Sequence, residues 1–326
     1  WKTFKEFLIF CMGISTSKEA IIAAVALYIL WSPKRLVSKL YFPCIPLITP
    51  FLINKEKAFF YFIALFPSLL FWGSGLLKEG IIFFALGFLC LHYFKIIEQF
   101  NFKSLIILLV SVILISFTKL YLLVALTIPL LAYLLSKSIG KQKLSYIITT
   151  VGIIGVSFLL PYLHQELNIY QLIAAKQQTF SRYILEVETN SGFILPELTD
   201  SWSIFKNIPI ALNNTLIRPY PWECNSAFVW LSLLENIMVI TLIVVALIFR
   251  KRTDSNFDIL AFCLIFAISL FILIGLTTPV FGAIIRYKIP ATLFLFIALL
   301  IIVDIDKLKA KFNWLTKILW QKTLPK

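Results

Sequence analysis

The sequence predicts an all-α integral membrane protein that crosses the bilayer several times. Of its 326 residues, 60% are hydrophobic and only 14% are charged, and soluble domains are far less apolar. Residues 260–276 and 287–303 are apolar on nearly every face of a helix, which suits lipid rather than water. We therefore expect one membrane domain over residues 1–326, with roughly eight or nine membrane segments, some of them short re-entrant or interfacial helices.

The positions of the membrane segments follow from the apolar runs. We expect crossings at residues 58–76, 80–94, 144–161, 228–249, 260–275 and 287–303. Residues 104–136 predict a hairpin with Phe117-Thr118-Lys119 at its outer turn, because basic residues flank both of its ends. Residues 40–53 carry three prolines and predict a re-entrant or interfacial segment. Residues 1–14 have apolar side chains at helical spacing and predict an interfacial helix, whereas the short apolar run 20–31 has no assigned side.

The orientation follows from the basic residues, which give a net charge of +14. They cluster in short segments between the apolar runs, and this pattern is typical of cytoplasmic loops. The clusters are Lys34, Arg35 and Lys39; Lys95 and Lys103; Lys137, Lys141 and Lys143; Arg250, Lys251 and Arg252; and the tail 304–326. A multi-pass protein of the plasma (inner) membrane is expected. No basic stripe interleaved with aromatic residues is present, so a nucleic-acid partner is not expected.

Two segments outside the apolar runs are amphipathic. The outer-face loop 162–223 has apolar residues at helical spacing in its first half, which predicts a helix along the outer surface. This helix either packs as a lid or spacer or covers a substrate. The basic cytoplasmic tail 304–326 repeats the pattern and is expected to bind anionic lipid headgroups of the bilayer.

Several charged residues fall on the predicted outer face, next to the apolar runs. Charge at membrane depth costs roughly 2.5 to 3.5 kcal/mol per residue, so several such residues on one face favour a cavity where they meet one another or an anionic ligand. Alternatively, each terminates a helix at the headgroup level, and this reading is favoured for Lys288. The candidate substrate-binding residues are Lys78, Glu79, Lys119, Arg218, Trp222, Glu223 and Arg286.

The segment Arg218-Pro219-Tyr220-Pro221-Trp222-Glu223 is the most specific of these features. Its two prolines restrict the backbone, and its arginine offers a planar fork for phosphate or carboxylate. Together with the tryptophan, it suits a sugar ring or a polyprenyl-linked phosphate. The alternative is that Tyr220 and Trp222 belong to the aromatic belt at the membrane interface.

Other chemistry is not indicated by the sequence. Nucleotide-binding, serine-hydrolase and zinc-protease motifs are absent. The five cysteines are interpreted as small buried hydrophobic residues, and the two histidines have no partners at ligand spacing. We expect no metal site, and no cofactor is evident.

Three places resemble the GT-C class of integral membrane glycosyltransferases and, more loosely, bacterial polysaccharide polymerases. The run Pro67-Ser68-Leu69-Leu70-Phe71-Trp72 with Lys78-Glu79 resembles an outer turn of that class, in which many members have Asp instead of Lys-Glu. The segment around Lys119, from Ile115 to Tyr121 and on to Pro129, is similar to a short hairpin with a central cation. Arg286-Tyr287-Lys288-Ile289-Pro290 is similar to an Arg-Tyr-x-x-Pro segment.

The resemblance implies transfer of a sugar from a polyprenyl-phosphate donor to a glycan, lipid or protein acceptor on the outer face. It also implies a catalytic carboxylate in a first outer loop that precedes the present sequence, so no catalytic residue is assigned. A transporter or flippase of lipid-linked saccharides, a polysaccharide polymerase and a non-catalytic membrane scaffold remain alternatives. Paired broken helices or an internal repeat would favour transport.

Overall fold

The computed structural model describes residue 68, residues 78–163, 169–187, 192–251 and 257–304, and residues 307, 308 and 311. The chain divides into two compact units, Trp1–Thr127 and Ile128–Lys326. In the described part of the chain every regular element is a helix, and the only β-type pairing consists of two isolated bridges. The segments predicted at 1–14, 20–31, 40–53 and 58–76, and most of the tail 304–326, lie outside the described residues.

The described part of the first unit consists of α6 (Lys78–Glu98) and the first part of α7 (Phe102–Ile139). On α6, Ile82, Leu86 and Leu89 are almost completely buried. A straight 38-residue helix would be about 57 Å long, roughly twice the hydrocarbon thickness of a bilayer. However, the backbone of α7 is non-helical at Lys119 (φ −152°, ψ 84°). The break falls within the predicted outer turn, and the hairpin itself stays a prediction.

The described helices confirm a multi-pass membrane protein. Within this part of the chain, α6, α7, α8 (Gln142–Leu163), α12 (Ala227–Ile248) and α13 (Phe257–Thr277) are long and apolar enough to cross a membrane. The pair α14 (Phe281–Tyr287) and α15 (Ile289–Ile302) is bent by 51° and passes the same test as one broken span. These are five or six spans, and the larger total of roughly eight or nine stays a prediction.

The last apolar run differs from the prediction of one crossing over 287–303. Its helical part begins earlier, at Phe281, and it is interrupted at Lys288. Pro290 lies in the first turn of α15, where a missing backbone N–H removes no helical hydrogen bond. The proline is therefore compatible with a second helix that starts just after the interruption.

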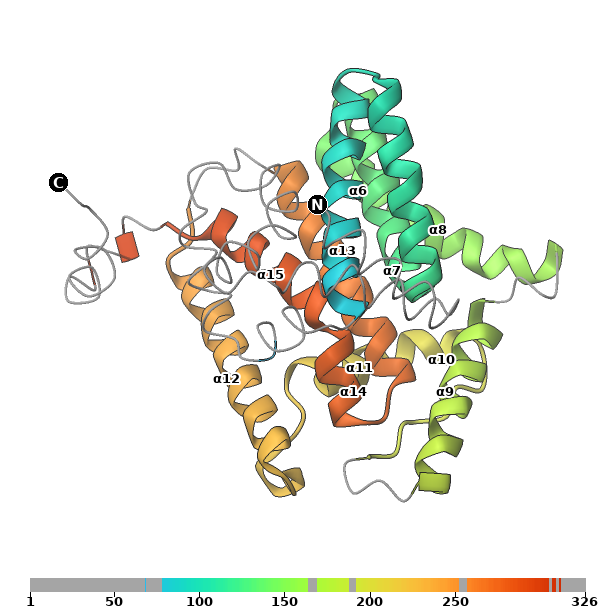
Figure 1. Cartoon of the computed structure of the whole chain (residues 1–326), viewed down its shortest axis with the longest axis vertical. Helices are drawn as coiled ribbons and strands as arrows, with labels where there is room; N and C mark the ends of the chain where they lie inside the picture. Colours follow the sequence, from blue (N-terminus) through green and yellow to red (C-terminus); the bar gives the residue numbers. More distant parts are fainter. Residues whose placement is uncertain are drawn as a thin grey trace, which may run out of the picture. The chain divides into compact units, whose positions relative to one another are not determined.

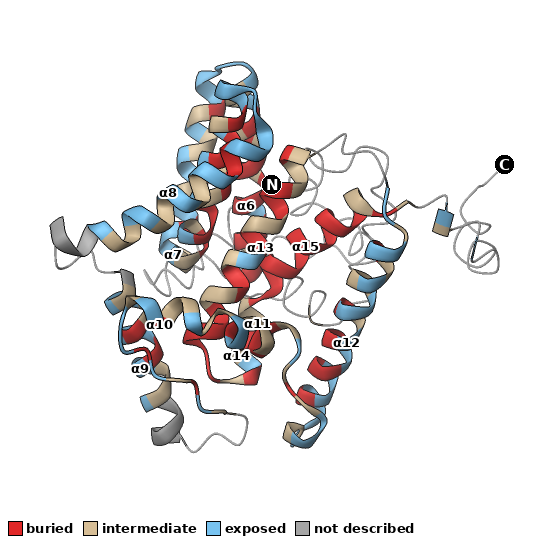
Figure 2. Ribbon diagram, turned by 180° about the vertical axis from the view of Figure 1, so that it is seen from behind, coloured by how far each residue is buried: buried red, intermediate tan, exposed pale blue. Residues whose placement is uncertain are grey.

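The core of the second unit lies between α13 and α15, which pack side by side (Figure 1). Phe262, Phe266, Phe294 and Phe296 are its largest fully buried side chains, and the rings of Phe266 and Phe294 meet edge to face at 4.5 Å. Figure 2 shows α13 and α15 mostly buried, whereas α8 and α12 expose many residues. Since those exposed residues are largely apolar, we infer that they face lipid.

A buried carboxylate fixes the beginning of α13. Asp258 accepts hydrogen bonds from Ser136 Oγ (2.6 Å) and Gln142 Nε2 (3.0 Å), and Lys137 Nζ lies 3.1 Å from its second oxygen. The Tyr146 hydroxyl donates to the Asp258 backbone carbonyl at 2.8 Å. The end of α7 and the start of α8 are therefore joined to the start of α13.

The other end of α13 carries the helices of the predicted outer segment. These are α9 (Ile169–Val187), α10 (Ser201–Lys206) and α11 (Ile208–Leu216). Ala174 of α9 and Ala211 of α11 pack with Leu198 and Leu276 in one buried cluster. Gln177 Nε2 donates to the carbonyl oxygens of Pro196 and Leu276, each at 3.0 Å. The first half of this segment is thus helical, and the buried face of α9 packs against the end of α13; its place along the outer surface stays a prediction.

The ends of α12 and α15 also lie together. Lys251 N donates to Ile302 O at 2.9 Å, and Asp304 N donates to Phe249 O at 2.7 Å. The basic segment after α12 is therefore adjacent to the start of the tail, as expected for two segments on one membrane side. The contacts of α13 place residues 137–143 and helices α9–α11 at opposite ends of one membrane helix.

We expect Ile194 to be extracytoplasmic and Ser138 cytoplasmic, and single-cysteine labelling tests this. Both residues are exposed, Ile194 at 95%. In a background with all five natural cysteines replaced by alanine, a membrane-impermeant maleimide should label Ile194→Cys in intact cells. It should label Ser138→Cys only after permeabilisation. The opposite pattern would reverse the orientation, and equal labelling in intact cells would contradict the topology.

Candidate functional site

Two of the predicted site residues form a buried ion pair in the first unit. Lys119 Nζ lies 3.0 Å from Glu79 Oε1, and the side chains of Lys119 and Glu79 are 9% and 1% exposed. Glu79 stands in the first turn of α6, where the helix dipole favours a negative charge. Lys119 stands at the break in α7. Lys78 begins α6, but its side chain lies outside the described part.

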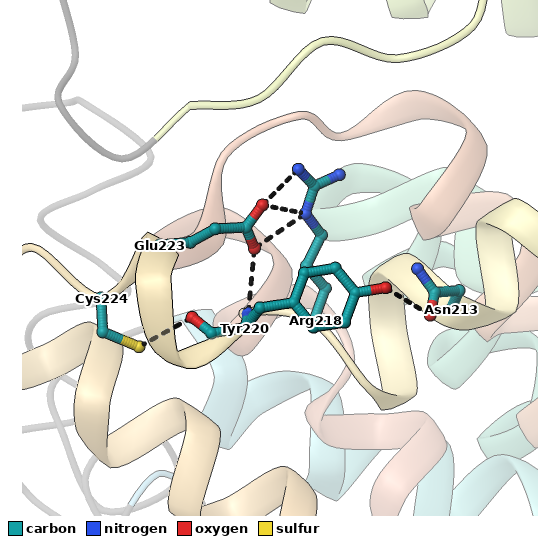
Figure 3. Close-up of polar contacts among 5 residues, drawn as sticks. All are labelled: Asn213, Arg218, Tyr220, Glu223 and Cys224. Atoms are coloured by element: carbon teal, nitrogen blue, oxygen red, sulfur yellow. Dashed lines mark hydrogen bonds and ion pairs between the residues drawn. The ribbon is translucent and has the colours of Figure 1, made fainter.

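The second group of predicted site residues forms a fork between Arg218 and Glu223 (Figure 3). Arg218 Nε donates to both carboxylate oxygens of Glu223, at 2.8 and 2.9 Å, and one terminal nitrogen also contacts this carboxylate. Tyr220 N donates to Glu223 Oε2 at 2.9 Å. Glu223 closes a short 3₁₀ turn, η3 (Pro221–Glu223), so the fork closes the turn around the two prolines.

The charge state of Glu223 follows from these contacts. Partial burial by itself would raise the pKa of this carboxyl group, but the hydrogen bonds from Arg218 and from the Tyr220 backbone hold its pKa below the ordinary value. Glu223 is therefore ionised at neutral pH, and the fork stabilises the fold above the pKa of the unfolded chain. This contribution is lost as the pH falls through the lowered pKa.

Aromatic rings surround the arginine of the fork. The Arg218 guanidinium lies 4.0 Å from the ring centre of Phe193 and 5.9 Å from that of Phe281, and these two rings stack at 5.1 Å. Phe193 N donates to Pro279 O at 2.9 Å, which joins the segment between α9 and α10 to the connection between α13 and α14. Arg286, another predicted site residue, is half-buried further along α14.

Trp222 extends the aromatic surface toward the exterior. Its ring stacks on Tyr220 with a centroid distance of 4.9 Å, and the residue is 78% exposed. The Tyr220 hydroxyl donates to Asn213 Oδ1 of α11 at 3.0 Å, which orients the tyrosine ring (Figure 3). Tyr220 therefore supports one face of Trp222, and the exposed remainder can contact a sugar ring or the membrane interface.

A buried polar network lies behind the fork. Asn236 Nδ2 of α12 donates to Arg218 O at 2.7 Å, and its Oδ1 accepts a short hydrogen bond from Lys288 Nζ. Lys288 Nζ also donates to Thr215 O at 3.2 Å. Lys288 ends α14 and is only 6% exposed, so its ammonium group lies within this network; its depth in the membrane stays a prediction.

Neither the comparisons nor the described residues identify a cofactor or a family. Within the described part of the chain, no group of three or more His, Cys, Asp and Glu residues could hold a metal ion. Cys90 and Cys224 are free thiols. Comparison of the chain with protein-family models, curated proteins and solved structures finds no match. The resemblance to GT-C glycosyltransferases therefore depends on the sequence segments alone.

Proposed function

We propose that the protein is a GT-C type membrane glycosyltransferase of the plasma (inner) membrane and cell envelope, and that residues 218–223 bind its polyprenyl-phosphate-linked sugar donor. The observation that supports this proposal is the oriented Arg218–Glu223 fork beside the exposed, stacked ring of Trp222. This arrangement offers a polar fork and an aromatic face within one short loop.

The fork favours a particular kind of ligand. In Figure 3, one terminal nitrogen of Arg218 contacts Glu223, while the other points away from that carboxylate. This second nitrogen can donate to a phosphate or hydroxyl oxygen without a change in side-chain geometry. Because Glu223 balances the positive charge of Arg218, the loop supplies directed hydrogen bonds with little net charge. A saccharide attached through a phosphate suits it better than a polyanion.

The proposed reaction is a transfer of the sugar to an acceptor hydroxyl. The bond between the anomeric carbon and the donor phosphate oxygen breaks, and a bond from the acceptor oxygen to the anomeric carbon forms. The acceptor proton passes to a carboxylate that acts as the general base, and polyprenyl phosphate leaves. The acceptor is a glycan, a lipid or a protein.

A second candidate, a flippase or transporter of lipid-linked saccharides, is favoured by the break between α14 and α15. Broken membrane helices with polar groups at the break are typical of transporter binding sites, and Lys288 is a buried cation at this one. Reconstituted vesicles distinguish the two functions. Transfer of labelled sugar to an acceptor supports the enzyme, whereas movement of an intact labelled lipid-linked sugar between leaflets supports the flippase.

Replacement of Trp222 by alanine is expected to weaken donor binding. Loss of one aromatic stacking partner corresponds to roughly a tenfold increase in Kd. The measurement is binding of undecaprenyl-phosphate-linked glucose to the purified chain in nanodiscs. Trp202→Ala is the matched control, because Trp202 is also exposed, at 57%, and lies in α10. Equal affinities for the two variants would assign Trp222 to the membrane interface instead.

A further inference from the structure

We infer that Asn236 and Lys288 are positioning residues that hold the 218–223 loop to helix α14, so that ligand binding at the loop is coupled to the break between α14 and α15. The identity of the ligand rests on the proposed function. The coupling itself rests on contacts within the second unit, which reach the loop from three helices.

The backbone contacts come first. Thr215 and Arg218 lie in the last turn of α11 and just after it, where carbonyl groups lose their helical partners. Lys288 donates to Thr215 O and Asn236 donates to Arg218 O, at 3.2 and 2.7 Å. The hydrogen bond between Lys288 and Asn236 joins the two contacts. Both positioning residues are buried, so water does not readily replace these bonds.

Helix α14 contacts the loop from both of its ends. At its beginning, Phe281 lies under the Arg218 guanidinium, with 5.9 Å from the ring centre to the guanidinium carbon. Immediately after its end, Lys288 donates directly to Thr215 O. Lys288 also donates to the Asn236 side chain, which in turn donates to Arg218 O. Because these contacts join the loop to both ends of a helix of only seven residues, a ligand that fixes Arg218 in its present position also favours the present geometry at the break.

Cys224 provides a reporter for the state of the loop. Its Sγ donates to Tyr220 O at 3.3 Å. Partial burial and the neighbouring charge of Glu223 raise the pKa of this thiol, so its reaction with maleimide is slow while the loop is held. Cys263 is fully buried in α13 and reports global unfolding in the same sample.

The experiment measures maleimide labelling of Cys224 and Cys263 in the purified full chain, in nanodiscs, with the other cysteines replaced by alanine. Asn236→Asp keeps an acceptor for Lys288 but removes the donor to Arg218 O, and Lys288→Met removes both bonds made by the ammonium group. Each should accelerate labelling of Cys224 about fivefold to tenfold, the factor expected for a lost buried hydrogen bond. Asn236→Asp should leave Cys263 protected and the melting temperature no lower.

Thr277→Val is the matched control, because it removes a buried hydroxyl that donates to Leu273 O, within its own helix. If Cys224 in Asn236→Asp and Lys288→Met reacts as slowly as in this control, the inference is overturned. Undecaprenyl-phosphate-linked glucose should slow Cys224 labelling in the parent chain. If the lipid-linked glucose does not slow labelling, but both variants still accelerate it, the positioning role stands and the proposed function fails. If the lipid-linked glucose slows labelling, but neither variant accelerates it, the proposed ligand stands and the positioning role fails.

Discussion

Replacing Gly275 with alanine should displace α11 from α13 and destabilise the second unit. A Cβ atom at this position would lie 2.1 Å from Ala211 O, 2.6 Å from its carbonyl carbon and 2.7 Å from its Cα. All three are backbone atoms, so no side-chain rotation relieves the clash. Overpacking typically costs about 1–3 kcal/mol, and we expect a loss of stability at the upper end of that range. Because α11 leads into Arg218, the loop should also be released.

The measurements are the thermal unfolding of the purified protein in one detergent and the rate of Cys224 labelling. Gly152→Ala in α8 is the matched control, since a Cβ there meets no atom within 4 Å. Such a change in a helix is expected to be neutral or slightly stabilising. If Gly275→Ala and Gly152→Ala have the same melting temperature, α11 does not pack so closely on α13.

The membrane helices could be predicted because each is encoded in consecutive residues. An apolar run of sufficient length identifies a span without any knowledge of its neighbours, and α12 and α13 match the predicted crossings 228–249 and 260–275 closely. Charge on both sides of a long apolar run predicted a hairpin turn that includes Lys119, and the backbone of α7 is non-helical at that residue. The break at Lys288 was not predicted, because the prediction began the last crossing at 287 and so treated the residues before it as a connection.

The polar contacts could be predicted only in part, because they depend on which helices meet. The Arg218–Glu223 fork lies within six consecutive residues, and its components were recognised together. Glu79 and Lys119 were identified separately, and only the fold shows that they pair across 40 positions. Asp258 and Asn236 were not predicted at all. A single polar residue lowers the mean hydropathy of an apolar run only slightly. Hydropathy therefore does not show that Asp258 and Asn236 bind partners that are distant in sequence.

Gly275 illustrates the same limit for packing. A glycine in an apolar run is common in membrane helices, and its role depends on the atoms of another helix. Gly152 and Gly155 in α8 have the same local character, yet a Cβ at either would meet nothing within 4 Å. Only the approach of Ala211 distinguishes Gly275 from them, and that approach is a property of how α11 packs.

Replacing Glu79 with glutamine should strongly destabilise the first unit. The change preserves side-chain shape but removes the charge that balances Lys119, 3.0 Å away in a nearly water-free environment. Removal of one partner from a buried ion pair typically costs about 3–5 kcal/mol. By contrast, removal of both charges in Glu79→Gln/Lys119→Met is expected to restore much of that stability, because no uncompensated charge remains. The measurements are the melting temperature and the amount of folded protein in the membrane.

Asp304→Asn supplies the control, since Asp304 pairs with Lys307 at 3.3 Å where the lysine is 55% exposed. Solvent screens such a pair, and its loss should cost about 0–1 kcal/mol. If Glu79→Gln behaves like Asp304→Asn, the ion pair in the first unit is not stabilising. The double variant then separates structure from function. If it folds normally and retains the proposed sugar transfer, Glu79 and Lys119 serve only to hold α6 against the break in α7. If it folds normally and loses the transfer shown by the parent chain, the two charges belong to the functional site.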